Sequence, residues 1–276
     1  MSNFEKGDKR IYEQVHEGVS YYHTVGEIYL HNRIKSKVHD YYNKYIKGKN
    51  NLRVLDIGCY VGTDIFMLPK TKDATYVGID VSESVINQAK VLAQVRNEEN
   101  VEFKVQDANG KFGFSEEEFD IIICLELLEH VQNPTDVLKE MKRILKPGGI
   151  IIMSTPNADY IMNKIVKFLP KSFLNKIHKE RVKDFTRSGK DFEVDPTVWD
   201  EDAHISLFGY SDWRRIVRKA GFVIKNVEGS SFFGGSRYIS DRPFLLGLAI
   251  IVDSIIDRLP FKPHLQMNMI ILLGKD

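Results

Sequence analysis

The sequence predicts an α/β fold in which a mostly parallel sheet is covered by helices. From residue 53 onward, short apolar runs alternate with amphipathic stretches, as in sheets whose parallel strands are joined by crossover helices. The first run passes directly into a glycine-containing turn, which is where such folds accept a nucleotide-like ligand. Together the two patterns place a candidate ligand site at the carboxyl ends of the strands.

Composition limits both the architecture and the partners of the chain. Its 276 residues, 43% of them hydrophobic, suffice for one substantial core, so we expect a single α/β domain with insertions. The formal net charge of +1 gives no overall attraction to nucleic acid, and any basic surface must be local. The first residues lack the apolar segment of a secretory signal, cysteines are scarce, and no apolar run reaches the ~18 residues of a spanning helix. These features predict a reduced, cytoplasmic protein.

Five apolar runs define the expected strands of the first part of the sheet. They cover residues 54–57, 76–80, 101–105, 119–124 and 150–153. Ser82 can cap the helix that follows the second run, and Asn133 with Pro134 supplies an N-cap and a first helical residue for a helix over 135–145. The Lys-Pro-Gly-Gly sequence at 146–149 predicts that this helix ends there and turns into the next strand.

The segments around this core have a different texture. Residues 1–50 are polar and rich in tyrosine with a helical period, and we expect N-terminal cap helices there, preceding the main domain at 51–276. Residues 156–203 interrupt the alternation and are expected to form a helical lid insertion. After them, a helix beginning at Ser211, a strand, an apolar helix at 242–259 and a last strand complete the domain.

The glycine turn carries the most specific chemistry. Gly58 and Gly62, which follow the first strand, permit the backbone to approach a ligand closely. A dinucleotide fold needs a middle glycine where Tyr60 stands, and Asp56 is unfavourable beside a diphosphate. A carboxylate at that position suits a cation, and S-adenosylmethionine carries an ammonium and a sulfonium group. The pattern therefore favours S-adenosylmethionine over a nicotinamide cofactor.

Two further carboxylates follow neighbouring strands. Asp80 closes the second run and can accept both ribose hydroxyls of an adenosyl group, although strand-end carboxylates are also common helix caps. Asp107 follows the third run and could accept the exocyclic amine of adenine, with Ala108 beside the ring. Asn109 and Gly110 next to it would also suit an ordinary turn. We predict cofactor binding by Asp80, Asp107 and Ala108.

Several motifs occur in the order and at the spacing of a known family. They are Leu-Asp-Ile-Gly-Cys at 55–59, Gly-Ile-Asp-Val-Ser at 78–82, Phe-Asp-Ile-Ile at 119–122, Leu-Leu-Glu-His-Val at 127–131 and Leu-Lys-Pro-Gly-Gly at 145–149. In these motifs the chain resembles class I S-adenosylmethionine-dependent methyltransferases, within the group that includes ubiquinone-biosynthesis O-methyltransferases. The resemblance covers residues 50–156 and 204–228, and it implies a Rossmann-like seven-stranded sheet whose last strand is antiparallel. Val81 and Leu125 complete the expected cofactor-binding residues. The chain departs from the family at Tyr60, where a glycine is usual; we expect this residue at the cofactor, with its ring either crowding the methionyl moiety or lining the pocket.

Two histidines are candidates for the base that deprotonates the acceptor. His130 follows the fourth run, where the acceptor would meet the methyl group, and His204 stands where relatives often have a histidine facing the acceptor. The alternative is that both residues hold loops through hydrogen bonds. Ubiquinone-type relatives can hold a divalent metal with the pattern formed here by Glu126, Glu129 and His130. No further ligand can be located in the sequence, and we expect no metal.

The surface outside the motifs bears on the partners. Lysines and arginines are dense between residues 164 and 190, and residues 244–252 are uninterruptedly apolar. A basic lid and an apolar helix could seat the chain on the inner face of an anionic membrane or hold a lipid-diphosphate-linked substrate. The alternative is that the basic run is solvated and that the helix at 242–259 packs on the sheet or on a second subunit, giving an oligomer.

The expected reaction is methylation of an acceptor oxygen. The resemblance favours a small-molecule or glycan acceptor, and specifically a sugar or a lipid-linked glycan. A small aromatic quinone precursor is the alternative acceptor, and a non-catalytic partner protein that binds S-adenosylmethionine is the alternative of another class. Nucleic acid is not expected, because no flipped-base motif follows the fourth run, where residues 125–128 read Leu-Glu-Leu-Leu.

Overall fold

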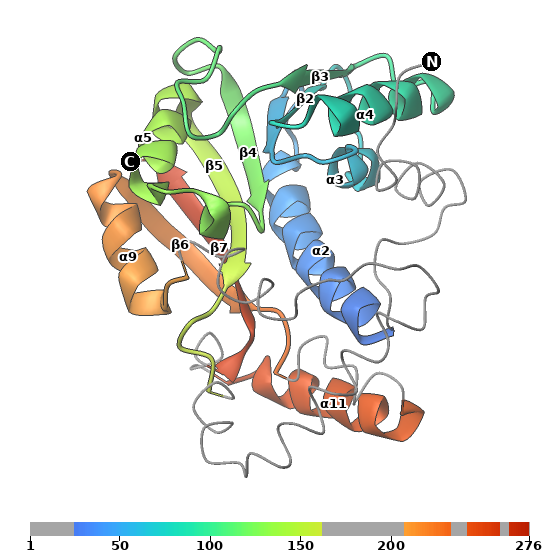
Figure 1. The fold of residues 1–276 in the computed structure, drawn as a ribbon, viewed down its shortest axis with the longest axis vertical. Coiled ribbons are helices and arrows are strands. Elements are labelled where there is room, and N and C mark those ends of the chain that lie inside the picture. The colour runs from blue at the N-terminus through green and yellow to red at the C-terminus, as the bar shows by residue number, and fades with distance from the viewer. Residues whose placement is uncertain (1–24, 162–206, 233–241, 260–264, 276) are drawn as a thin grey trace, which may run out of the picture.

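The computed structural model describes residues 25–161, 207–232, 242–259 and 265–275, which form a seven-stranded sheet with helices on both faces (Figure 1). The strand order is β3-β2-β1-β4-β5-β7-β6. The strands are β1 (Arg53–Ile57), β2 (Thr75–Asp80), β3 (Val101–Val105), β4 (Phe119–Leu125), β5 (Leu145–Pro156), β6 (Phe222–Gly229) and β7 (Asn268–Lys275). Strands β1 to β5 pair in parallel, whereas β7 runs antiparallel to both β5 and β6. The predicted fold class, including the antiparallel last strand, is confirmed.

The core consists of two layers separated by the sheet. Successive residues of a strand point to opposite faces, so Ile122 and Cys124 of β4 pack with α5 (Pro134–Ile144) and α9 (Tyr210–Lys219). Ile121 and Ile123 pack on the other face with α2 (Val25–Ile46), α3 (Thr63–Met67) and α4 (Glu83–Val95). All four side chains are fully buried, as expected for a strand covered on both faces.

The described part of the predicted cap region is one helix, α2, and it packs on the sheet itself. Ile34, Val38 and Tyr42 recur every four residues and form a buried stripe in the core on that face. The hydroxyl of Tyr42 lies 3.1 Å from the hydroxyl of Tyr76 on β2. Residues 25–46 are therefore a layer of the main domain, whereas residues 1–24 of the predicted cap lie outside the described residues.

One predicted boundary was wrong. We expected the helix before β5 to end at residue 145, which agrees within one residue with α5, and the strand to begin near Ile150 after a turn at 146–149. The structure begins β5 at Leu145, because Leu145 already pairs with Phe119 on β4. The register shifts between Phe119 and Ile121, and Gly148 adopts a positive φ of 74° inside the strand. Pairing with the neighbouring strand, rather than local turn propensity, sets this boundary.

The apolar helix α11 (Pro243–Ile256) connects β6 to β7. It contacts α2 through polar groups, since Tyr29 donates to the carboxylate of Asp253 at 3.0 Å and Arg33 pairs with Asp257 at 2.7 Å. None of the helices in the described ranges is long and apolar enough to cross a bilayer. Of the predicted lid insertion at 156–203, only its first residues up to 161 fall within the described part of the chain.

Candidate cofactor and acceptor site

The turn after β1 is held in a conformation that requires glycine. Gly58 and Gly62 have φ angles of 76° and 81°, in the region that favours glycine. A Cβ atom added at Gly62 would lie 2.4 Å from Cζ of Phe103, so the turn also packs too closely for a larger residue. The N–H groups of Gly58 and Cys59 donate to the carbonyl of Ile79 at 2.8 and 3.0 Å. The turn is thereby fixed against the carboxyl end of β2.

Tyr60 occupies the middle of this turn with a φ of 50°. This is the left-handed conformation that glycine adopts readily and that costs other residues about 1–2 kcal/mol. Its N–H donates to Oδ2 of Asp80 at 3.1 Å. The departure from the family motif therefore changes the side chain but keeps a glycine-like backbone.

Asp80 joins two loops at the carboxyl end of β2. In addition to the N–H of Tyr60, its carboxylate accepts the N–H of Ser82 through Oδ1 at 3.0 Å. Ser82 is the N-cap of α4, as predicted, although its hydroxyl makes no capping hydrogen bond. Each carboxylate oxygen has two lone pairs, so Asp80 retains capacity for ribose hydroxyls. Val81 beside it is 67% exposed, and an exposed aliphatic side chain there fits the face of a flat ring.

Asp56 is a buried carboxyl group at the carboxyl end of β1. Its side chain is 2% exposed, and Oδ2 has no hydrogen-bond partner among the described residues. Burial raises the pKa of Asp56 well above its usual value, and the charges of Asp64 and Asp80 raise it further. A bound cation would offset both effects. The residues present therefore fit a cofactor that carries positive charge.

The third predicted carboxylate has a local role. Asp107 is exposed, and its Oδ1 accepts the backbone N–H of Asn109 at 2.8 Å and the side-chain amide at 3.1 Å. This is the turn that the sequence offered as the alternative, and a contact of Asp107 with adenine stays a prediction. Ala108 and Leu125 are half-buried and pack against the core at the same edge of the sheet.

A second polar cluster lies at the carboxyl end of β4. Ser154 on β5 donates its hydroxyl to Oε1 of Glu126 at 2.6 Å, and Asn268 on β7 donates its amide to Oε2 at 2.7 Å. The backbone N–H of Glu126 also donates to the carbonyl of Ser154 at 3.1 Å, and Glu126 has a positive φ of 50°. Burial raises the pKa of the Glu126 carboxyl to about 7. The cluster thus fixes a carboxyl group that exchanges its proton near neutral pH.

Glu129 and His130 follow on the 3-10 helix η1 (Leu128–His130), where the first side chain is buried and the second is exposed. Glu129 is 1% exposed, and neither its Oε2 nor the hydroxyl of Thr155 has a partner among the described residues. Burial, with a contribution from Glu126, raises the pKa of Glu129 to about 9. The side chain of His130 is exposed. His204, the other predicted base, lies outside the described residues.

Among the described residues, no group of three His, Cys, Asp or Glu side chains is arranged to hold a metal ion. The site does, however, contain polar residues that the motifs did not single out. Ser154, Thr155 and Asn268 are all buried. The sequence offered a signal for Ser154 and Asn268, because polar residues within otherwise apolar strands are usually buried only when they are hydrogen-bonded.

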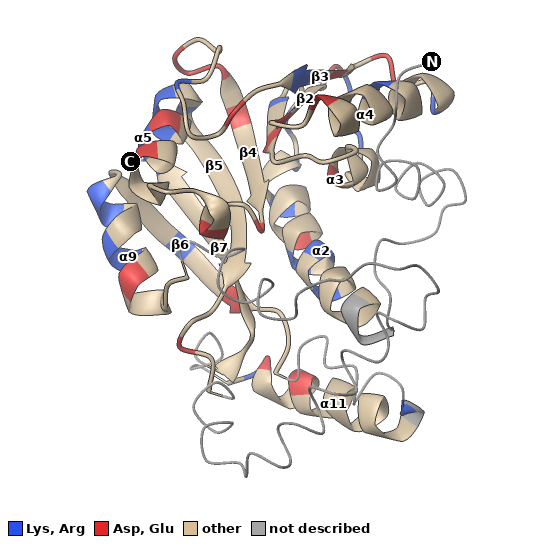
Figure 2. Cartoon of the chain, viewed as in Figure 1, with Lys and Arg blue, Asp and Glu red and all other residues tan. Residues whose placement is uncertain are grey.

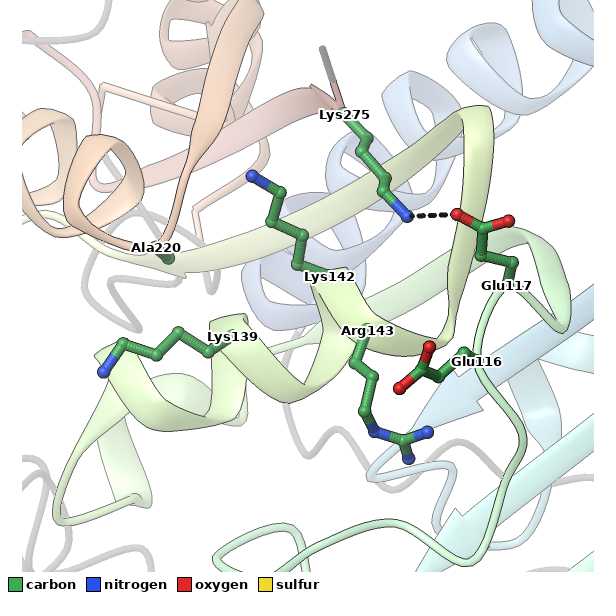
Figure 3. Close-up of a pocket in the computed structure, with 7 residues that line it drawn as sticks. All are labelled: Glu116, Glu117, Lys139, Lys142, Arg143, Ala220 and Lys275. Carbon is green, nitrogen blue, oxygen red and sulfur yellow. Dashed lines mark hydrogen bonds and ion pairs between the residues drawn. The ribbon is translucent and has the colours of Figure 1, made fainter.

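A hollow of about 340 Å³ lies near the amino ends of the parallel strands, away from the carboxyl ends described above (Figure 3). Its lining includes Lys142 and Arg143 from α5, together with Lys275, which pairs with Glu117 at 3.2 Å. Because β7 is antiparallel, Lys275 lies beside the amino end of β5. Ligands of open α/β sheets bind outside the carboxyl ends, so this hollow is not the cofactor site.

Comparison with known proteins identifies the family. A family model described as a methyltransferase domain matches residues 48–221, more than half of the chain. The chain belongs to this methyltransferase family. The methyltransferase is 32% identical over 136 residues to the ubiquinone biosynthesis O-methyltransferase of Hydrogenovibrio crunogenus, covering 49% of this chain and 56% of that protein. It therefore spans about half the length of the curated relatives it matches.

Solved structures share the fold of the methyltransferase. A S-adenosylmethionine dependent methyltransferase from Mesorhizobium loti superposes with a TM-score of 0.51 at 16% identity, covering 80% of this chain and 90% of that one. The [4+2]-cyclase SpnF superposes with a TM-score of 0.54 at 20% identity, covering 87% and 80%. At such identities the likeness shows the fold alone, and one fold can host different chemistry. Family membership rests on the sequence match, and S-adenosylmethionine is the cofactor of this methyltransferase domain.

Proposed function

We propose that the methyltransferase transfers a methyl group from S-adenosylmethionine to a hydroxyl oxygen of an acceptor bound at Glu126. The observation that carries this proposal is the Glu126 carboxyl, fixed between Ser154 and Asn268 with a pKa raised to about 7. A carboxylate with this pKa is partly ionised at neutral pH and can accept the hydroxyl proton. The name of the matched relatives, O-methyltransferase, supports oxygen as the methylated atom.

The chain's own residues divide the work of binding. When bound, S-adenosylmethionine supplies a methyl group on a positively charged sulfur. Asp56 would balance the positive charge of the cofactor, Asp80 would accept its ribose hydroxyls, and Val81 would contact the adenine. At the neighbouring strand end, Glu126 orients the acceptor hydroxyl and takes its proton. The protein thus contributes the alignment of the two reactants and the base that removes the hydroxyl proton.

We favour a sugar hydroxyl, free or in a lipid-linked glycan, as the acceptor. Two buried groups beside the Glu126 cluster, the hydroxyl of Thr155 and Oε2 of Glu129, have no hydrogen-bond partner among the described residues. Buried groups of this kind need hydrogen-bond partners, which a polyhydroxylated acceptor supplies. An aliphatic hydroxyl is also a weak acid, so its methylation depends strongly on a base such as Glu126.

The second candidate acceptor is a small phenol of the quinone-precursor type. It is favoured by the name of the relatives, ubiquinone biosynthesis O-methyltransferase. A phenol is a stronger acid, with a pKa near 10 for tyrosine, so its methylation depends less on Glu126.

Initial rates of methyl transfer to panels of sugars and phenols test the proposal, with wild type and Glu126→Gln compared. We expect Glu126→Gln to reduce turnover by about 10²–10⁴-fold while S-adenosylmethionine binding is retained. A smaller loss with a phenol would identify the second candidate acceptor. The proposal fails if Glu126→Gln turns over like wild type, and a loss in His130→Ala alone would return the role of base to the histidine. Cofactor binding without turnover on any acceptor would support the non-catalytic alternative.

A further inference from the structure

One side of α11 presents large apolar side chains to solvent. Phe244, Leu248, Ile251 and Ile255 are 76%, 44%, 57% and 54% exposed. They are spaced four, three and four residues apart, which places them along one stripe of the helix. We call these four residues the outer stripe. The stripe is a candidate site of interaction, because its four large apolar side chains are contiguous and exposed rather than scattered singly.

The opposite side of α11 is firmly attached to the protein. Asp253 is fully buried and accepts hydrogen bonds from Tyr29 at 3.0 Å and from the hydroxyl of Ser231 at 2.7 Å. Asp257, just after the helix, pairs with Arg33 at 2.7 Å. Both acidic side chains are therefore paired with groups of the protein, and the outer stripe is held outward by a fixed helix.

Among the described residues, the exposed charged side chains that flank α11 are positive. Arg242 precedes α11 and Arg258 follows it, and both side chains are exposed. The helix itself carries no lysine or arginine, and its one acidic residue is the buried Asp253. Figure 2 shows α11 as a largely uncharged element. The exposed face thus consists of an apolar stripe with a cation at each end.

We propose that the outer stripe lies in the interfacial layer of a bilayer that contains anionic lipids. Helices that lie in this layer bury an apolar side at the boundary of the acyl chains and place cations at the headgroups. With 14 residues, α11 is about 21 Å long and cannot span a hydrocarbon core of about 30 Å, so it lies flat. Arg242 and Arg258 complement the negative headgroups at the two ends of the helix.

A second copy of the chain is a poorer match for the outer stripe. A helix about 21 Å long and about 10 Å wide offers a face of roughly 200 Å². Stable protein interfaces bury about 800 Å² on each partner. The stripe alone is therefore too small for a stable dimer, whereas a lipid surface needs no matching protein contour.

The helix α11 is connected to the polar cluster of Glu126, Ser154 and Asn268, which we call the acceptor cluster. Ser231, which binds Asp253 of α11, follows Ser230, whose N–H donates to the carbonyl of Asn268 at 3.0 Å. Asn268 is also the amide donor to Glu126. The membrane surface is inferred from α11 alone, and under the proposed function it suits a lipid-linked acceptor.

Vesicle flotation tests this inference. Wild type, the double variant Phe244→Glu/Ile251→Glu and the control Val95→Glu are mixed with vesicles of phosphatidylcholine alone or of phosphatidylcholine with phosphatidylglycerol. Val95 is a matched control because it is 69% exposed on a different helix, α4. We expect wild type and Val95→Glu to float with the anionic vesicles, and the double variant to partition at least about tenfold less. Neutral vesicles are expected to bind wild type more weakly.

The proposal is overturned if wild type stays in the aqueous fraction or if the double variant floats equally well. It is also overturned if sedimentation velocity shows a wild-type dimer that the double variant converts to a monomer, since a second copy would then cover the stripe. Titration with S-adenosylmethionine shows that each variant is folded. Because flotation needs no acceptor, its result is independent of whether the proposed reaction is correct.

Discussion

The central strands carry carboxyl groups at both ends, and the partners of these groups differ between the amino ends and the carboxyl ends. At the amino ends, Asp120 accepts one hydrogen bond from the ammonium of Lys146 at 2.7 Å and another from the backbone N–H of Arg53 at 2.8 Å. Glu118 pairs with the guanidinium of Arg53 at 2.7 Å. These carboxylates have cationic partners within the chain and stabilise the fold where they stand.

At the carboxyl ends, the carboxyl groups have no such cation. Asp56, Glu126 and Glu129 form no ion pair among the described residues, and burial is the largest effect that raises the pKa of each. A buried carboxyl without a cation is costly, so a fold does not gain from keeping several. The difference is consistent with our proposal that the amino ends serve stability and that the carboxyl ends serve the cofactor and the acceptor.

The largest expected effect is on cofactor affinity, when a carboxylate at the carboxyl ends of the strands is neutralised. Asp80→Asn removes the charge that accepts the N–H groups of Tyr60 and Ser82 and that would accept the ribose hydroxyls. We expect S-adenosylmethionine affinity, measured by calorimetric titration, to fall at least about 100-fold, or about 2.7 kcal/mol. Asp120→Asn at the amino end is the matched control and should change affinity by less than about twofold. Equal losses in the two variants would remove the distinction between the ends.

The next effect is on the pH dependence of stability. The raised pKa of Glu129, about 9 against 4.5 in an unfolded chain, means that the folded state retains a proton that the unfolded state has lost. Stability from this group is full below pH 4.5 and is lost as pH rises through about 9. Between pH 7 and 9, above the pKa of about 7 for Glu126, the free energy of unfolding should fall by up to about 1.4 kcal/mol per unit.

Urea denaturation at several pH values measures this slope. Glu129→Gln should flatten the decline between pH 7 and 9, whereas Glu118→Gln at the amino end should leave the slope as in wild type. A wild-type stability that rises with pH over this range would show that Glu129 is not held protonated.

A smaller effect is expected from breaking an ion pair at the amino end. Lys146→Ala removes the partner of Asp120, but the Lys146 side chain is 37% exposed, so solvent screens the pair. The free energy of unfolding should fall by no more than about 1 kcal/mol, and S-adenosylmethionine affinity should stay the same. Thermal unfolding and titration of the same variant check both parts. A loss of affinity would mean that the amino end also contributes to the cofactor site.

The smallest effect concerns the strained turn at the carboxyl end. Tyr60→Gly relieves a φ of 50° but increases the freedom of the unfolded chain, and the two effects oppose each other. We expect the free energy of unfolding to change by less than about 1 kcal/mol, with cofactor binding retained. Loss of binding in this variant would assign the tyrosine ring a direct part in the site.

The strands and the glycine turn could be predicted because their signals are local. One short motif contains Asp56, Gly58 and Gly62, and Asp80 ends the adjacent strand. Because the two strands are parallel, their carboxyl ends and these residues lie side by side. The start of α4 after Ser82 followed from capping preference in the same way.

The acceptor cluster could not be assembled from local signals. Glu126 and Asn268 are 142 residues apart and meet only because β7 inserts antiparallel beside β5. Likewise, the burial of Glu129 and the exposure of His130 depend on the single turn of η1, which no periodicity predicts. This is why the sequence pointed to a histidine as the base, whereas our proposal of Glu126 rests on contacts that only the folded chain brings together.

The most direct measurement is calorimetric titration of S-adenosylmethionine at several pH values, comparing wild type with Asp56→Asn. Burial raises the pKa of Asp56, and a bound cation favours its ionised form. We therefore expect wild type to bind more tightly than the variant and to gain affinity as pH rises, whereas the affinity of the variant should depend less on pH. Failure of wild type to bind, or equal affinity of the two proteins at every pH, would contradict the assignment of these strand ends to the cofactor.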